Sequence, residues 1–138
     1  MQHTLSIIEN ALWPILEAGF TVTIPLALIS FALSLVLAVL TAVMRISKSK
    51  ILKGLAWFYV WVFRGTPLLI QLFIVFFGLP KLNITLDAWT AAILTFALNS
   101  GAYSAESIRG AILSIPRGQW EAADSLGMTH GQVLKRII

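Results

Sequence analysis

The feature that most constrains the fold is an uncharged run of 25 residues, Phe20 to Met44. A helix needs about 20 apolar residues to cross the hydrocarbon core of a bilayer, so this run is long enough to span one. Hydrophobic residues make up 58% of the chain and charged residues 12%, whereas soluble domains carry about a quarter charged residues. The sequence therefore predicts an integral membrane protein of the all-α class.

Two further apolar segments follow the first, and the basic residues flank all three. Eight of the ten lysines and arginines lie either in residues 45–53 or after residue 108. Because positively charged loops stay in the cytoplasm, both of these regions are predicted to be cytoplasmic, with the N-terminus outside. We expect one domain, residues 1–138, built as a polytopic membrane helical bundle. Its three transmembrane helices are predicted at about 20–44, 55–79 and 87–108, followed by a cytoplasmic loop at about 114–138.

Composition and motifs argue against several kinds of site. The chain has no cysteine, and His3 and His130 lie far apart, so no metal site is predicted. It has no phosphate-binding loop of the G-x-x-x-x-G-K-S/T type, so it is not expected to bind or hydrolyse ATP. Glu106 has no His, Cys or second carboxylate at a suitable spacing, so no catalytic residue is predicted. The net charge of +4 reflects membrane topology rather than nucleic-acid binding.

Polar residues in the third segment lie on one helical face. Asn99, Tyr103, Glu106 and Gly110 are spaced i, i+4, i+7 and i+11. Charged groups inside a membrane span are costly and usually mark a pathway or a pairing. Glu106 suits a substrate ammonium, and Asn99 and Tyr103 suit hydrogen bonds, so these three are candidate substrate-binding residues. The alternative is that they hold helices together, with Glu106 simply paired to Arg109.

The second segment is interrupted by Arg64, Gly65, Thr66 and Pro67. Pro67 removes a backbone hydrogen bond and Gly65 adds flexibility beside it, so a bend is predicted here. These four residues are candidates for gating, with Arg64 able to reach the cytoplasmic interface. The alternative is that Arg64 only anchors the helix and Pro67 only kinks it.

The polar C-terminal segment predicts a short helix that ends at a glycine. Pro116 suits the first turn of a helix, and Ser114 just before it is a possible cap. Residues 119–126 are then predicted to be helical, and Gly127 suits the left-handed position that ends a helix.

A second short helix is predicted over residues 131–138, because Thr129 and Gln132 have the spacing of a capping box. Between the two ends of the segment, Ala122 and Ala123 are expected to leave a low surface that another protein could approach closely.

These motifs together resemble the permease subunits of ABC importers, in the branch that handles polar amino acids such as histidine, glutamine, glutamate, arginine, cystine and opines. Glu121-Ala122-Ala123, three residues, Gly127, nine residues and Ile137 match the spacing of that family's EAA loop, through which the permease grips its ATPase. The segments 63–69 and 99–106 also look like segments of that branch. The likeness runs from residue 19 to residue 138.

The resemblance implies a permease of the bacterial cytoplasmic membrane that forms part of the translocation path for a polar amino acid. Its implied partners are two cytoplasmic ATP-binding subunits, a second permease copy or paralogue, and an extracytoplasmic solute-binding protein. ATP would bind on the partner subunits, so no cofactor is expected in this chain. Glu121, Ala122, Ala123, Gly127 and Ile137 would couple to the ATPase. The family has about five crossings, so the three here are expected to form an N-terminal portion.

Two other classes of function stay open from the residues alone. One is a membrane scaffold or sensor subunit that docks a partner through residues 121–127 without transporting a solute. The other is a pore in which Glu106 forms a cation-selective ring. ATP-dependent uptake would separate a permease from a scaffold, and a steady ionic current without ATP would indicate the pore.

Overall fold

The computed structural model describes the backbone of residues 2–136 and the side chains of residues 10–129, 131–133 and 136. This part of the chain is helical and contains no strand. Its elements in order are α1 (Gln2–Ala18), the π-helical turn η1 (Gly19–Thr23), α2 (Ile24–Ile46), α3 (Lys50–Gly65), α4 (Leu68–Phe73), the π-helical turn η2 (Ile74–Gly78), the 3₁₀ turn η3 (Leu79–Leu82), α5 (Ala88–Leu113), α6 (Arg117–Ser125) and α7 (His130–Arg136).

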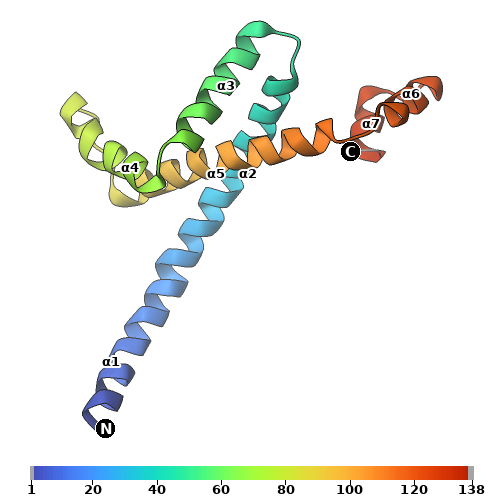
Figure 1. The fold of residues 1–138 in the computed structure, drawn as a ribbon. Helices are drawn as coiled ribbons and strands as arrows, with labels where there is room; N and C mark the ends of the chain where they lie inside the picture. Colours follow the sequence, from blue (N-terminus) through green and yellow to red (C-terminus); the bar gives the residue numbers. More distant parts are fainter. Residues whose placement is uncertain (1, 137–138) are drawn as a thin grey trace.

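The first predicted helix is confirmed, but it is longer than expected. α1, η1 and α2 form one rod (Figure 1), of which residues 10–46 are long and apolar enough to cross a membrane. Within it, Pro25 has no N–H to complete the α-helical ladder. The chain accommodates this with the π-helical turn, in which the N–H of Ile24 bonds to the carbonyl of Gly19.

The predicted bend in the second segment is also confirmed. α3 and the elements from α4 to η3 meet at 104°. Taken together as one bent pair, they are long and apolar enough to cross a membrane. The break falls at Thr66 and Pro67, which both have extended backbone. The helix begins at residue 50 rather than 55, because Ser49 caps it by accepting a hydrogen bond from the N–H of Leu52 at 3.5 Å.

α5 has 26 residues and is capped by Asp87, whose carboxylate accepts from the N–H of Thr90 at 3.1 Å and from its hydroxyl at 2.6 Å. It continues beyond the predicted end at residue 108. Within residues 2–136, one helix is long and apolar enough to cross a membrane, or two if the bent pair forms one span, and α5 is not among them. The number of crossings therefore stays a prediction.

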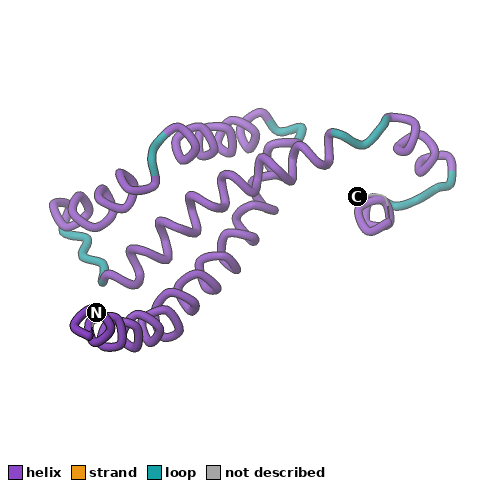
Figure 2. The backbone as a smooth tube through the Cα atoms, turned by 60° about the horizontal axis from the view of Figure 1, so that its bottom comes forward, coloured by secondary structure: helices purple, strands orange, loops and turns teal. Residues whose placement is uncertain are grey.

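The core lies where α5 crosses α2, with α3 alongside (Figures 1 and 2). Both helices bury small side chains there, which lets the backbones approach closely. On α2 the buried residues are Ser30, Ser34, Ala38, Thr41 and Ala42. On α5 they are Ala91, Thr95, Ala97, Gly101, Ala102 and Ala105. The short helices α6 and α7 stand away from this core (Figure 2).

Candidate functional site

The C-terminal segment folds into two short helices, which we call the C-terminal knob (residues 114–136). α6 begins directly after Pro116, as the sequence predicts. The prediction that Ser114 caps α6 is wrong: its hydroxyl donates to the carbonyl of Ala111 at 2.8 Å, and Ser114 ends α5 instead. A serine hydroxyl that can reach a carbonyl of the preceding turn favours this arrangement over a forward cap.

Gly127 ends α6 in the predicted left-handed conformation, with φ of 66°. The N–H of Met128 bonds to the carbonyl of Ala123, and the N–H of Gly127 to that of Asp124, both at 3.0 Å. This pair of bonds is a Schellman motif. A Cβ on residue 127 would meet no atom within 4 Å. Glycine is therefore favoured here by the backbone conformation and not by lack of space.

The predicted capping box opens α7. The side-chain oxygen of Gln132 accepts from the N–H of Thr129 at 2.8 Å, which is the reciprocal half of that motif. The helix begins at residue 130, one residue before the predicted start. Caps at both ends of the turn fix the angle between α6 and α7 by local chemistry.

The exposed face of the knob carries part of the predicted ATPase-coupling set. Glu121, Ala122 and Gly127 are exposed, whereas Ala123 is 1% exposed. The expectation that Ala122 and Ala123 both form an approachable surface is therefore wrong for Ala123, which is buried. Successive side chains of a helix point about 100° apart, so two neighbouring alanines can differ in exposure. Ile137 lies outside the described residues.

Side-chain amides bond to the carbonyls at the backbone break between α3 and α4. The Gln71 amide nitrogen donates to the carbonyls of Phe63 and Thr66, both at 2.9 Å, and lies 2.7 Å from the hydroxyl of Thr66. Asn99 of α5 donates to the carbonyl of Phe63 at 3.3 Å and to the side-chain oxygen of Gln71 at 3.1 Å. The two amides thus satisfy carbonyls that the break leaves without helical partners.

A second polar group surrounds Glu106. One carboxylate oxygen accepts from the guanidinium of Arg45 on α2 at 3.2 Å, and the other accepts from Arg109, with its Nε at 2.7 Å. The side chains of all three are largely shielded, with 16–29% of their surface exposed. Glu106 therefore ties α5 to α2, as the helix-pairing alternative predicted, and also pairs with Arg109.

Two of the three candidate substrate residues, Asn99 and Tyr103, lie near the C-terminal end of α3, and the third, Glu106, borders a cavity along that helix. The guanidinium of Arg64 lies 5.2 Å above the ring of Tyr103, a cation–π contact. Asn99 contacts the break, and Glu106 borders a cavity of about 320 Å³. Its lining residues are Arg45, Trp57, Val60, Trp61, Arg64, Gly65 and Glu106. The cavity thus combines two guanidinium groups, one carboxylate and two indoles.

Sequence reasoning missed Gln71, which is 7% exposed and closes the break. A signal was present: Gln71 is the single polar side chain in the apolar run 68–78. A lone amide in a membrane span usually has a hydrogen-bonding role.

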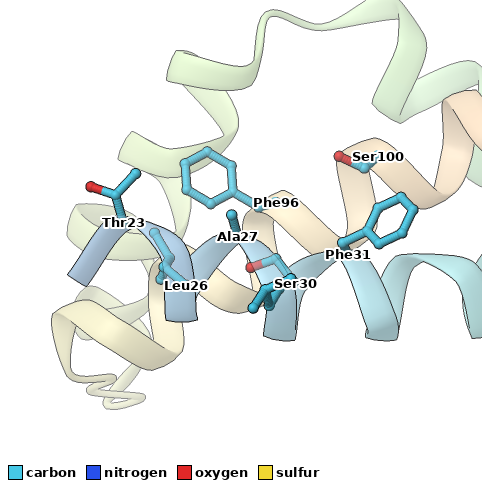
Figure 3. A pocket seen from close by; sticks show the side chains of 8 residues that line it. Thr23, Leu26, Ala27, Ser30, Phe31, Phe96 and Ser100 are labelled. Carbon is cyan, nitrogen blue, oxygen red and sulfur yellow. The ribbon is translucent and has the colours of Figure 1, made fainter. Parts of the chain in front are cut away.

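A larger cavity, of about 580 Å³, lies between α2 and α5 away from these polar groups (Figure 3). Its lining is mostly apolar and includes Leu26, Phe31 and Phe96. Three hydroxyl-bearing residues, Thr23, Ser30 and Ser100, also line it, and the Ser30 oxygen has no hydrogen-bond partner in the described part of the chain. With no charged group in its lining, this cavity does not suit a zwitterionic solute.

Residues 34–138 match the protein family described as the binding-protein-dependent transport system inner membrane component. Among curated proteins, the chain is 48% identical to the L-cystine transport system permease protein TcyB of Bacillus subtilis, over 96% of this chain and 56% of the relative. It is 41% identical to the putative glutamine transport system permease protein GlnP of Rickettsia prowazekii, over 87% of this chain and 56% of the relative. It is 39% identical to the arginine transport system permease protein ArtQ of Bacillus subtilis, over 91% and 58%.

A solved structure shows the same fold. The chain superimposes with a TM-score of 0.83 and 37% identity on a chain from a crystal structure of an amino acid ABC transporter with histidines. The match covers 96% of this chain and 61% of that one. This chain therefore spans a little over half the length of the relatives it matches.

Proposed function

Because the chain belongs to the family of binding-protein-dependent transport system inner membrane components, we propose that it forms part of the path of an ATP-driven amino-acid importer. In this proposal the C-terminal knob docks cytoplasmic ATP-binding subunits. The helices α2, α3 and α5 contribute to a route for a polar amino acid.

The observation that carries the proposal is the geometry of the knob. The Schellman turn at Gly127 and the Thr129–Gln132 box hold two short helices at a fixed angle. Glu121 and Ala122 are exposed on that knob, directly beyond the end of α5. A rigid, exposed element at the end of a long helix can receive a movement from a partner and pass it on.

The arrangement of the basic residues supports a cytoplasmic position for the knob, and hence an outside N-terminus. Arg45, Lys53 and Arg109 lie in different helices, yet they line one cavity at the end of the bundle next to the knob. The positive-inside rule assigns such a cluster to the cytoplasmic face.

Polar amino acids suit the charges that line the cavity of about 320 Å³ beside α3. Glu106 could receive a substrate ammonium and Arg64 a carboxylate, and Asn99 and Tyr103 add hydrogen-bonding groups. The relatives are named for transport of L-cystine, glutamine and arginine, which all carry both charged groups. In this proposal the broken segment Arg64, Gly65, Thr66 and Pro67 acts in gating, because its backbone has already left the helical path.

The partners in this proposal are two ATP-binding subunits, a second permease copy or paralogue, and an extracytoplasmic solute-binding protein. ATP is hydrolysed on the partner subunits, and the permease chain itself has no enzymatic role. ATP binding would move the two knobs relative to each other and open the path alternately to each side.

The experiment is reconstitution of the assembled transporter in proteoliposomes with a radiolabelled polar amino acid. We expect uptake that requires ATP and the solute-binding protein. Binding of the ATP-binding subunits without uptake would instead support a scaffold, and steady current without ATP would support a pore.

A separate experiment tests the orientation. The chain has no cysteine, so a single cysteine introduced at the exposed Ser125 would be labelled uniquely by a membrane-impermeant maleimide. We expect labelling only after the membrane is opened. Labelling of intact cells would place the knob outside and overturn the proposal.

A further inference from the structure

Three cationic side chains from three helices surround one cavity of about 400 Å³. Arg45 belongs to the last turn of α2, Lys53 to the first turn of α3 and Arg109 to the last turns of α5. The remaining lining residues are Ile46, Trp57 and Leu113. No acidic side chain lines this cavity.

The charges around the cavity are not balanced within the described part of the chain. Glu106 is the one carboxylate that pairs with Arg45 and Arg109, and it approaches them from the neighbouring cavity. Lys53 makes no ion pair among residues 10–129. Three like charges around a partly desolvated space repel one another, so an anion placed there would be favourable.

The apolar lining indicates what kind of anion fits. Trp57, Leu113 and Ile46 are 53%, 61% and 40% exposed, and they border the same cavity as the cations. A small anion such as inorganic phosphate would satisfy the charges but leave these side chains uncovered. A molecule with an anionic head and hydrocarbon chains covers both kinds of surface.

We propose that this cavity binds the phosphate headgroup of an anionic phospholipid, with its acyl chains along Trp57, Ile46 and Leu113. The assignment of the lipid to the cytoplasmic leaflet rests on the orientation given under Proposed function. Bound there, the lipid would join the ends of α2, α3 and α5 immediately before the knob.

The test uses fluorescence of Trp57 in nanodiscs, with Trp13, Trp61, Trp89 and Trp120 replaced by phenylalanine. Brominated phosphatidylglycerol and brominated phosphatidylcholine are titrated at equal mole fractions into an unlabelled phosphatidylcholine background. We expect quenching by the phosphatidylglycerol at several-fold lower mole fraction. Equal quenching by both lipids would overturn the proposal.

A matched pair of variants separates a site from general charge attraction. Lys53→Gln should weaken phosphatidylglycerol binding about five-fold, the effect expected for one lysine at an anionic headgroup. Lys50→Gln removes the same charge from the same turn of α3 but does not line the cavity, so its effect should stay below two-fold. Equal losses in the two variants would mean that no specific site exists.

Two further arms complete the test. Inorganic phosphate at millimolar concentration should not relieve the quenching; full relief would show that the site takes a free anion and not a lipid. Native mass spectrometry of the protein with all its native tryptophans provides a second readout. In it, the Lys53→Gln variant should retain less phosphatidylglycerol than the Lys50→Gln variant. If the protein does not prefer phosphatidylglycerol over phosphatidylcholine but still takes up solute in an ATP-dependent way, this inference is overturned and the transport proposal stands.

Discussion

The hydroxyl of Tyr59 on α3 donates a 2.6 Å hydrogen bond to the backbone carbonyl of Leu98 on α5. The bond lies beside a close approach of α5 to α2: a Cβ on Gly101 would lie 3.0 Å from the Tyr59 oxygen and 3.4 Å from the carbonyl oxygen of Ser34. Three helices therefore meet at one point. The Tyr59 hydrogen bond joins α3 to α5, and the lack of a side chain at Gly101 allows the helices to approach closely.

Replacing Tyr59 by phenylalanine should lower the free energy of unfolding by about 0.5–1.5 kcal/mol, because the hydrogen bond is lost while the ring is kept. Denaturation by sodium dodecyl sulfate in mixed micelles, monitored by circular dichroism, measures the change in this free energy. Tyr103→Phe is the control, since the structure gives the Tyr103 hydroxyl no partner among residues 10–129. Equal stability of the Tyr59 variant and the parent would show that the bond contributes nothing.

Gly101→Ala should destabilise the chain by about 1–3 kcal/mol, because the added methyl group overpacks the contact with Tyr59 and Leu37. Gly110→Ala on the same helix has no atom within 4 Å of the new Cβ, so it should be neutral or stabilising by up to about 1 kcal/mol. The same denaturation assay compares the two. Similar losses at both positions would contradict the close approach at residue 101.

Gln71 and Asn99 should be energetically coupled, because their amides bond to each other and share the carbonyl of Phe63. A double-mutant cycle with Gln71→Leu and Asn99→Leu should give a coupling energy of roughly 0.5–2 kcal/mol. The single Gln71 variant should also loosen the break, which a pair of spin labels on α3 and α4 would report as a broader distance distribution. Strict additivity would mean that the two amides act independently.

Gly127→Val should uncouple ATP hydrolysis from transport, since a β-branched residue is strained at φ of 66° and would distort the turn between α6 and α7. The measurement is the number of ATP molecules hydrolysed per solute imported in proteoliposomes. Gly118→Ala is the matched control, because residue 118 lies in α6 at negative φ with free space around it. Unchanged coupling in the valine variant would count against docking through the knob.

Glu106→Gln should reduce uptake of cationic amino acids more than that of neutral ones, because in our proposal the carboxylate receives the side-chain cation that only the cationic amino acids carry. Arg45→Gln breaks the same interhelical ion pair while the carboxylate keeps its charge, so it should affect both substrate classes alike. Competition uptake with arginine and glutamine compares the two variants. An equal loss for both solutes in the Glu106 variant would show that Glu106 does not receive a side-chain cation.

Features that depend on a few neighbouring residues were predictable from the sequence. Gly127 had to adopt a left-handed backbone to end α6, Pro67 lacked the N–H needed to continue α3, and Thr129 with Gln132 had capping-box spacing. In each case the backbone chemistry acts within about four residues, so the local sequence is sufficient.

Contacts between distant residues were not predictable in the same way. Arg45 pairs with Glu106 across 61 positions, although the sequence offered Arg109 as a nearer partner. Gln71 bonds to carbonyls five and eight positions earlier at the α3–α4 break, and only the fold brings Asn99 to it. Ala123 looks the same as Ala122 in sequence, and only the packing of the knob distinguishes them.

α5 continues without interruption from Asn99, which touches the α3–α4 break, to Leu113, which adjoins the knob. About 14 residues at a rise of 1.5 Å separate these positions by roughly 21 Å. A hydrogen-bonded helix of that length shortens or bends little. A displacement imposed at the knob end of α5 would therefore arrive at the α3–α4 break almost undiminished, without any rearrangement of the residues in between.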